Sequence, residues 1–396
     1  MTSQRRTLKR VVIVGGAAAG LASAESLRRN GHEGEIVIVG DEHDQSCDRP
    51  PLSKQLLSGQ WAPEKAVLMP AARLERIGAV LRTGRAVSLD VEGHQVGLSD
   101  GNVLDYDALV AATGVRPRTL PGAAVPGVHV LRTLEDSLTL RGTLGEGRTL
   151  VIVGGGFLGL EVAATARKLG TDVTVVEPVP TPLASRLGTH TAERLLAEHA
   201  DRGVLVRRGI GAAEILTTNG PGGPVAAGVR TTEGDELAAD AVLVAIGSVP
   251  NVEWLTDSGI DTVDGVVCDS YCQAAPDVWA AGDVARWHHA GLGRSLRLEH
   301  RINATEQGQV VGRNIVGDSP EAFTPTPFFW TDHYEVKIQL AGVIPEGSLE
   351  RTELDENGSV IRSFSVDGRL LGVVGWNAAK ALIPYRRELD LSPLPV

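Results

Sequence analysis

The chain has 396 residues, of which 42% are hydrophobic and 22% charged, and its formal net charge is −11. This length predicts two or three domains, and the acidic balance argues against non-specific nucleic-acid binding because no long basic run offsets it. Three cysteines are too few for a disulfide framework and their spacing fits no metal pattern, so we expect no bound metal and a reducing compartment.

The first element in the chain reads as a strand that leads into a phosphate-binding turn. RVVIV predicts a buried strand, and Gly15-x-Ala17-x-x-Gly20 follows it with a helical pattern. EIVIVGD predicts a second strand ending at Asp41, where a carboxylate accepts hydrogen bonds from ribose hydroxyls. In such a unit the first glycine makes the turn, the middle position admits a pyrophosphate, and the last glycine lets helix and strand pack closely. Ala17 replaces the usual middle glycine, so the match is imperfect.

The same segment contains the longest uncharged stretch of the chain. Val11–Ala24 has 14 residues, which is too short and too glycine-rich for a membrane span. It also lacks a signal-peptide cleavage pattern. We therefore expect a cytoplasmic protein with no membrane attachment, and nothing in the sequence demands more than a monomer or a weak homodimer.

A second and cleaner unit follows in the middle of the chain. TLVIV predicts a strand, which leads into Gly154-x-Gly156-x-x-Gly159, a helix and a strand ending at Glu177. Gly154 and Glu177 lie 23 positions apart, close to the roughly 20 of a dinucleotide-binding fingerprint. A carboxylate at that place pairs with a 2′-hydroxyl and repels a 2′-phosphate, which favours NADH. Two units in one chain predict two different dinucleotides, with FAD on the first and a nicotinamide nucleotide on the second.

The later segments read as the completion of the first unit. DYDALVAATGVRP and DAVLVAIGSVPN share one pattern and indicate crossings between the two nucleotide domains. DVWAAGDVA delivers Gly282 and Asp283, an acid that can bind ribityl or ribose hydroxyls of FAD. From about residue 320 the chain is rich in proline and aromatic residues, and alternating apolar runs follow, which predict an antiparallel sheet.

Several of these blocks together resemble a known family. SCDRPPLSK, ATGVRP, LRTLED, GGGFLGLEVAATARKLG, AIGSVPN, AAGDVA, RLEHRINATEQG and FFWTDHY occur in the order found in the FAD-dependent, NADH-using ferredoxin reductases of bacterial oxygenase systems. The resemblance implies an α/β fold with two Rossmann-like domains, for FAD and NAD, of the glutathione-reductase-like type, plus a small α+β C-terminal domain. The implied domains are 1–110 and 241–320 for FAD, 111–240 for NAD(H), and 321–396 at the C-terminus.

The resemblance also implies a reaction and the residues that perform it. Hydride passes from NADH to FAD, and single electrons then pass to a ferredoxin that supplies an oxygenase such as a cytochrome P450 or a Rieske dioxygenase. Lys54 and Glu161 are the expected catalytic ion pair beside flavin N5. The expected contacts to FAD are Ala19, Asp41, Arg49, Lys54, Ala86, Arg132, Asp283, His300, Arg301 and Trp330. Those along NADH are Gly156, Leu158, Gly159, Glu161, Glu177 and Gly247. The glycine turns and strand ends add the cofactor-binding residues Gly15, Ala17, Gly20, Thr113, Gly114, Gly154 and Gly282.

Two other functions stay open at this point. An NADH oxidase or a disulfide reductase would use Cys47, although QSCDRPP follows the ferredoxin-reductase pattern and the first helix lacks the C-x-x-x-x-C pair of glutathione-reductase-like enzymes. A non-enzymatic redox-sensing flavoprotein is the other alternative. Cys268 and Cys272 are expected to be buried small side chains. An acidic ferredoxin would need a local basic patch, for which the candidates are Arg294, Arg297, Arg301 and Arg313.

Overall fold

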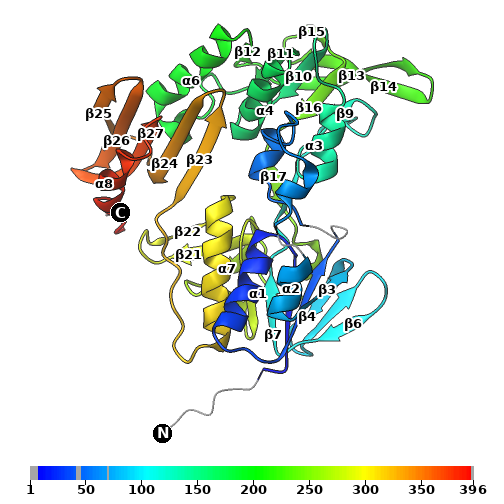
Figure 1. Ribbon diagram of the computed structural model, residues 1–396, viewed down its shortest axis with the longest axis vertical. Helices are drawn as coiled ribbons and strands as arrows, with labels where there is room; N and C mark the ends of the chain where they lie inside the picture. The colour runs from blue at the N-terminus through cyan, green and yellow to red at the C-terminus, as the bar shows by residue number, and fades with distance from the viewer. Residues whose placement is uncertain (1–7, 42–45, 69–70, 394–396) are drawn as a thin grey trace.

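The computed structural model describes residues 8–41, 46–68 and 71–393, and it places them around three principal sheets (Figure 1). The first is a six-stranded sheet in the order β19-β20-β7-β1-β2-β3. Its strands are β1 (Arg10–Val14), β2 (Glu35–Gly40), β3 (Ala79–Thr83), β7 (Ala108–Ala111), β19 (Gln273–Ala275) and β20 (Val278–Ala280). Because β19 and β20 come from beyond residue 270, the chain leaves this sheet and returns to complete it.

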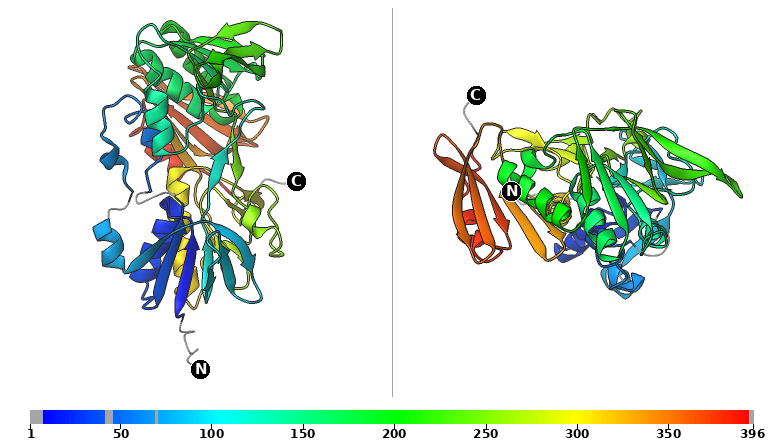
Figure 2. Two further views of the ribbon diagram at one scale, coloured as in Figure 1. Left: turned by 90° about the vertical axis from the view of Figure 1, so that its right-hand side faces the viewer. Right: turned by 90° about the horizontal axis from the view of Figure 1, so that it is seen from above.

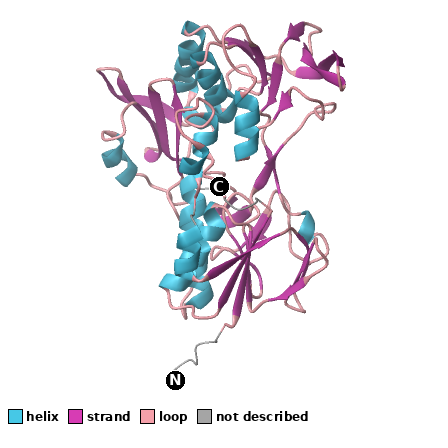
Figure 3. Cartoon of the chain, turned by 45° about the vertical axis from the view of Figure 1, so that its right-hand side comes forward, coloured by secondary structure: helices cyan, strands magenta, loops and turns pink. Residues whose placement is uncertain are grey.

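Two helices lie side by side on one face of the first sheet, as Figures 2 and 3 also show. They are α1 (Ala18–Arg29) and α7 (Arg301–Val316). Their close approach depends on glycine, since a Cβ on Gly308 would lie 2.4 Å from the carbonyl oxygen of Ala19. The strands β1 and β2 bury nearly every side chain, as expected of parallel strands covered on both faces.

The second sheet is entirely parallel and belongs to the middle of the chain. Its order is β12-β11-β10-β16-β9. The strands are β9 (Val128–His129), β10 (Thr149–Val153), β11 (Asp172–Glu177), β12 (Leu205–Arg208) and β16 (Ala241–Val244). Helix α4 (Phe157–Lys168) connects β10 to β11, and α6 (Thr189–Asp201) precedes β12. The second glycine motif runs from the end of β10 into α4, so it forms the strand-to-helix turn that the sequence predicts.

The third sheet is antiparallel, so the prediction made from the alternating apolar runs is confirmed. Its order is β23-β24-β27-β26-β25. The strands are β23 (Phe328–His333), β24 (Val336–Gly342), β25 (Leu349–Glu356), β26 (Ser359–Val366) and β27 (Arg369–Trp376), and α8 (Leu382–Arg387) follows them. Ile338 and Val374 of this sheet share one hydrophobic core with Leu160 of α4 and Leu195 of α6. The C-terminal sheet is therefore packed onto the second unit.

Smaller elements complete the fold. β8 (Val115–Pro117) and β17 (Ser248–Pro250) pair antiparallel where the chain crosses between the first and second units. The other small sheets are β4 (Ala86–Asp90) with β5 (Gln95–Leu98) and β6 (Val103–Asp105), β13 (Ala212–Gly220) with β14 (Gly223–Thr231) and β15 (Glu236–Ala238), and β18 (Val266–Cys268) with β21 (Ala285–His289) and β22 (Arg294–Leu296). The remaining helices are α2 (Ala71–Ile77), α3 (Leu134–Arg141), α5 (Ala184–Leu187) and the 3-10 turns η1 (Pro50–Ser53), η2 (Pro63–Ala66) and η3 (Glu253–Leu255).

Both Rossmann-like units and the small α+β C-terminal part are thus present, as the sequence predicts. The residue-by-residue domain boundaries stay a prediction. Across residues 8–41, 46–68 and 71–393, none of the helices combines the length and the apolar character that crossing a membrane requires.

Candidate functional site

The first glycine of each motif occupies a backbone conformation that other residues avoid. Gly15 has φ +117° and Gly154 has φ +109°. A Cβ at Gly15 would lie 2.1 Å from the carbonyl oxygen of Ala112, and one at Gly154 would lie 2.3 Å from that of Ala245. Both turns therefore need glycine for the conformation and for the space beside the neighbouring strand.

The last glycine of each motif sets the distance between helix and turn. A Cβ on Gly20 would lie 1.9 Å from the carbonyl oxygen of Gly15, and one on Gly159 would lie 2.0 Å from that of Gly154. A Cβ on the middle glycine, Gly156, would meet nothing within 4 Å among the described residues. The middle position therefore opens toward a ligand space, and in the first unit the methyl group of Ala17 lines that space.

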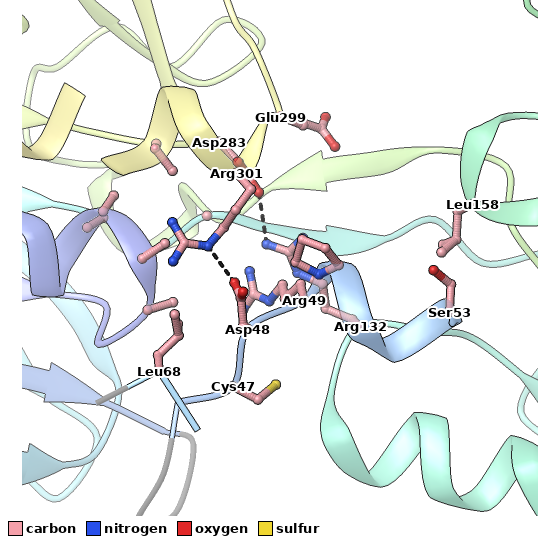
Figure 4. A pocket seen from close by; sticks show the side chains of 18 of the residues that line it. Cys47, Asp48, Arg49, Ser53, Leu68, Arg132, Leu158, Asp283, Glu299 and Arg301 are labelled. Carbon is pink, nitrogen blue, oxygen red and sulfur yellow. Dashed lines mark hydrogen bonds and ion pairs between the residues drawn. The ribbon is translucent and has the colours of Figure 1, made fainter. Parts of the chain in front are cut away.

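A central pocket begins at this turn and extends toward the second unit (Figure 4). Its walls come from the start of α1, the segment before η1, the start of α4, and the start of α7. The helix N-termini of α1 and α7 present backbone N–H groups toward it, which favours negatively charged ligand groups. Ten of the predicted site residues line it: Ala17, Ala19, Arg49, Gly114, Arg132, Leu158, Glu161, Gly282, Asp283 and Arg301.

Two ion pairs shape the charge of the central pocket. Arg132 Nη2 lies 3.1 Å from Asp283 Oδ2, and Arg301 pairs with Asp48, as the dashed lines of Figure 4 show. Burial, and then repulsion from the guanidinium of Arg49, lowers the pKa of Arg132. Nε of Arg132 is buried and has no hydrogen-bond partner in the described part of the chain. A buried donor of this kind suits a pocket that receives a polar ligand.

A second pocket lies at the carboxyl ends of β1 and β2, where open α/β sheets bind nucleotides. Gly15, Asp41, Ala86 and Thr113 line it, and all four are predicted site residues. Asp41 is exposed, and its Oδ2 lies 3.1 Å from Nε of Arg85. The acid at the end of β2 therefore faces the space that a nucleoside would occupy.

A third pocket lies where the second unit and the C-terminal sheet meet the segment from β22 to the start of α7. The predicted residues among those that line it are Arg132, Gly156, Leu158, Gly247 and His300. The ring of His300 lies 5.1 Å from that of Phe329, and Phe329 lies 4.7 Å from Phe157, centroid to centroid. Burial lowers the pKa of His300 to about 4, so this ring is neutral at neutral pH. Its Nδ1 atom is buried without a hydrogen-bond partner among the residues described.

Lys54 and Glu161 meet beside the central pocket. Lys54 Nζ lies 2.6 Å from Glu161 Oε2, and Ser53 Oγ donates to the same oxygen at 2.6 Å. Thr331 Oγ donates to the other carboxylate oxygen at 2.7 Å. Burial raises the pKa of Glu161, but the ammonium of Lys54, with further help from His333 and Ser53, outweighs burial and lowers it. The ion pair therefore joins Lys54, at the end of η1, to α4.

Six predicted site residues line none of the three pockets: Gly20, Lys54, Gly154, Gly159, Glu177 and Trp330. Glu177 is buried, and its carboxylate accepts hydrogen bonds from the backbone N–H groups of Gly155 at 2.7 Å and Val179 at 2.8 Å. Trp330 lines none of the three pockets, whereas its neighbour Phe329 lines the third. FFWTDHY offers three adjacent aromatic rings, and only the side on which β23 packs decides which ring faces the pocket.

Sequence reasoning also missed several polar contacts. Asp48, Ser53 and Thr331 complete the ion pairs and hydrogen bonds of the site, but each is a common residue with no local signal. Asp48 and Ser53 lie inside the SCDRPPLSK block and Thr331 inside FFWTDHY, so membership of these blocks is the signal that could have found them. Cys47 lines the central pocket and is buried. Cys268 and Cys272 are buried free thiols, as predicted, and burial raises the pKa of Cys272 to about 12.

Comparison with known proteins agrees with this arrangement. Residues 9–308 match the family model described as pyridine nucleotide-disulphide oxidoreductase. The chain is 36% identical to rhodocoxin reductase of Rhodococcus erythropolis, over 97% of this chain and 91% of that protein. It is 35% identical to putidaredoxin reductase CamA of Pseudomonas putida, over 87% and 84%.

Solved structures give the same result over nearly the whole chain. The covalent putidaredoxin reductase–putidaredoxin complex matches with a TM-score of 0.90 and 31% identity, covering 96% of this chain and 94% of that one. A ferredoxin reductase from Rhodopseudomonas palustris matches with a TM-score of 0.91 and 31% identity, covering 97% and 96%. With its two glycine turns and these matches, the chain belongs to the pyridine nucleotide-disulphide oxidoreductase family.

Proposed function

We propose that this chain is an FAD-dependent NADH:ferredoxin oxidoreductase, which takes hydride from NADH and passes single electrons to a ferredoxin that supplies an oxygenase. The observation that carries the proposal is the ionised Lys54–Glu161 pair. It borders the central pocket, and the third pocket shares Phe157, Leu158 and Arg132 with the central one. Two ligands held in these two pockets would therefore meet beside the pair.

The residues present fit FAD in the first two pockets. The pocket at Asp41 would hold the adenosine, and the turn from Gly15 to Gly20 with the N-terminus of α1 would hold the pyrophosphate. The central pocket would hold the flavin, with the unpartnered Nε of Arg132 available as a donor. FAD, when bound, supplies a ring system that accepts hydride and gives up electrons one at a time.

The third pocket is the place we propose for the nicotinamide of NADH. Gly156 and Gly247 leave its floor open, and a Cβ on Gly247 would come only within 3.9 Å of Arg118. The neutral ring of His300 and the rings of Phe329 and Phe157 form its apolar wall. An apolar wall excludes water and strengthens electrostatic interactions at the site.

Lys54 has a specific task in this proposal. Arrival of a hydride brings negative charge next to the pair, and a fixed ammonium stabilises that charge without reorganisation. Glu161 and Ser53 hold the ammonium in place by contacts of 2.6 and 3.1 Å to its Nζ. Glu161 and Ser53 therefore position the lysine.

We infer that the ferredoxin docks near the third pocket, beside β22. Three of the four candidate arginines are engaged in ion pairs, Arg297 with Asp264 and Glu299, Arg301 with Asp48, and Arg313 with Glu321. Arg294 is exposed and lines the third pocket. At low salt, Arg294→Glu should slow electron transfer to an acidic ferredoxin several-fold more than it slows NADH oxidation with ferricyanide, and Arg313→Glu is the matched control.

The disulfide-reductase alternative has little structural support. Cys47 belongs to the core shared by η1, α4 and the C-terminal sheet, whereas Cys268 and Cys272 lie in the core of the first unit. A disulfide reductase needs a second thiol close to the first. Free thiols at Cys268 and Cys272 also support the inference that the protein works in the reducing cytoplasm.

The experiment that tests the proposal is an anaerobic NADH titration of the purified flavoprotein, followed in the visible spectrum. One two-electron equivalent should bleach the flavin, and added ferredoxin should then restore it. Lys54→Met should slow reduction about 100-fold, while Lys65→Met, which changes an exposed lysine on η2, should not. Uptake of a second two-electron equivalent would instead favour the oxidase or disulfide-reductase function through Cys47, and unchanged reduction in Lys54→Met would contradict the role of the pair.

A further inference from the structure

A line of buried hydrogen-bonding side chains leads away from Glu161 on the side opposite Lys54. Thr331 Oγ lies 2.7 Å from Glu161 Oε1 and 2.9 Å from Nε2 of His333. His333 Nδ1 lies 3.4 Å from Nε2 of His199. His199 Nδ1 lies 3.2 Å from the hydroxyl of Tyr334. Each contact is within hydrogen-bonding reach, so five side chains form one continuous line.

The line crosses from the buried site to the molecular surface. Glu161 and His333 are brought together by the packing of β23 on α4, and His199 comes from α6 (Figure 1). Thr331, His333 and His199 are at most 1% exposed, while Tyr334, in the turn between β23 and β24, is partly exposed. Around the ring of Tyr334 lie the surface charges Lys168, Glu198, Arg202 and Glu335.

The proposed reaction creates a need for such a line. NADH yields NAD⁺, two electrons and one proton, and ferredoxins remove only the electrons. One proton must therefore leave the site in each turnover. The side chains of Lys54 and Glu161 are only 14% and 10% exposed, and ligands in the adjoining pockets would cover them further.

We propose that Glu161, Thr331, His333, His199 and Tyr334 form a proton relay between the Lys54–Glu161 pair and solvent. This inference rests on the proposed function. The protons balance at every step. Lys54 gives a proton to Glu161 and is reprotonated from the reaction site. The carboxyl group of Glu161 then turns, and Glu161 passes its proton to Thr331 Oγ.

The remaining steps move one proton at a time in the same direction. Thr331 gives its proton to His333 Nε2, and His333 gives its Nδ1 proton to His199 Nε2. His199 gives its Nδ1 proton to the oxygen of Tyr334, which releases its own to water. Afterwards Glu161 is ionised and Thr331 donates to it, which is the hydrogen bond that the structure contains. Both imidazoles are neutral before and after the transfer. Each ring begins with its proton on Nδ1 and ends with it on Nε2, so the ring proton must return to Nδ1 before the next turnover.

Burial explains why the two histidines stay neutral. It lowers the pKa of His333 to about 4 and, with repulsion from His333 and Arg202, that of His199 to about 3. The backbone carbonyl of Leu160 accepts a hydrogen bond from the His333 ring and acts in the opposite direction, raising the pKa of His333. It therefore stabilises the ring while it briefly holds a second proton. Neutral imidazole is both a donor and an acceptor, so each ring can accept on one nitrogen and donate from the other.

The test separates proton release from hydride transfer. Holoenzyme is reduced anaerobically with one equivalent of NADH in weak buffer with a pH-indicator dye, and then mixed with ferricyanide, which takes electrons but no proton. In the wild-type protein, proton release should keep pace with reoxidation of the flavin. His333→Gln, His199→Gln and Tyr334→Phe should slow release about tenfold or more and leave reduction by NADH within about twofold. His190→Gln, on the exposed start of α6, is the matched control.

Nitrogen-15 spectra of the histidine rings give a readout that does not depend on turnover. At neutral pH both rings should be neutral with the proton on Nε2, and Glu161→Gln should shift the ring nitrogens of His199 through two intervening residues. Proton release at the wild-type rate in all three relay variants would overturn the relay, and so would an equal fall in hydride transfer and proton release. Tyr334→Phe retains the ring packing and keeps the test valid if a histidine variant does not fold. Failure of NADH to reduce the wild-type flavin would instead overturn the proposed function.

Discussion

The two dinucleotide-binding turns have nearly the same backbone but hold their strand-end acids in different ways. Asp41 of the first unit is exposed, lines a pocket and pairs with the exposed Arg85. Glu177 of the second unit is buried, and its two oxygens accept backbone N–H groups of Gly155 and Val179. The acid at this motif position thus lines a pocket in the first unit, whereas in the second unit it stabilises the glycine turn by hydrogen bonds to its backbone. An acid at the end of the second strand therefore does not by itself establish a ribose contact.

The largest effect should come from what the two units share, the last glycine of the motif. Gly20→Ala and Gly159→Ala each put a Cβ about 2 Å from a backbone carbonyl oxygen, which cannot move without the turn. We expect each variant to lose about 4 kcal/mol or more of stability. Urea unfolding measures this loss, and Gly156→Ala, with no atom within 4 Å of the new methyl group in the described chain, is the control. If one variant loses much less stability than the other, the backbone of that unit can shift to make room for the Cβ and the backbone of the other unit cannot.

The next effect should distinguish the second unit by its pH dependence, because His199 and His333 are fully buried where that unit meets the C-terminal sheet. Their folded pKa values, about 3 and about 4, lie below the unfolded value of 6.5, so the unfolded chain binds protons first as pH falls. Stability is fully present above 6.5 and falls as pH drops from there toward the folded values. At about pH 5 each histidine should cost about 2 kcal/mol.

Unfolding by urea at several pH values measures this cost, and His199→Gln should remove about half of it. If the variant loses stability with acid as steeply as the wild-type protein, the buried histidines are not its source.

A smaller effect should sharpen the contrast between the acids. Glu177→Gln puts an amide N–H₂ against a backbone N–H group and should cost about 1–3 kcal/mol. Asp41→Asn removes only an exposed ion pair and should change stability by at most about 0.5 kcal/mol. Thermal unfolding of both variants compares them directly. Equal losses of stability in the two variants would mean that Asp41 also stabilises its glycine turn.

The smallest effect should come from exchanging the middle positions. Ala17 and Gly156 both have extended backbone angles that any residue adopts. Ala17→Gly and Gly156→Ala should therefore change stability by less than about 1 kcal/mol, and they should act instead on cofactor binding, since both positions line pockets. Dissociation constants of flavin and NADH, measured by fluorescence, test this. A large change in melting temperature would contradict it.

Much of the fold and part of the site could be predicted from local patterns. The glycine spacings predict the two turns, because the positive φ and the lack of room for a Cβ leave no other residue possible. The alternating runs predict the C-terminal sheet. The juxtaposition of Lys54 with Glu161 followed only from family resemblance, since the two are 107 positions apart and no local rule joins them.

Other features were beyond reach of the sequence because they depend on which way a side chain turns. Strand alternation puts Phe329 and Trp330 on opposite faces of β23 but does not say which face meets the pocket. The line from Glu161 to Tyr334 depends on α4, α6 and β23 packing together, which brings five separate positions within hydrogen-bonding distance.

By itself the sequence determined the elements and turns whose causes are local, namely backbone conformation, steric room at glycine and the period of apolar residues. Only the tertiary structure decided that Glu177 turns inward to its own backbone, that Arg301 pairs with Asp48, and that His199 meets His333. The physical reason is that a buried polar group takes whichever partner the packing provides, and in this chain those partners lie 22 to 253 positions away.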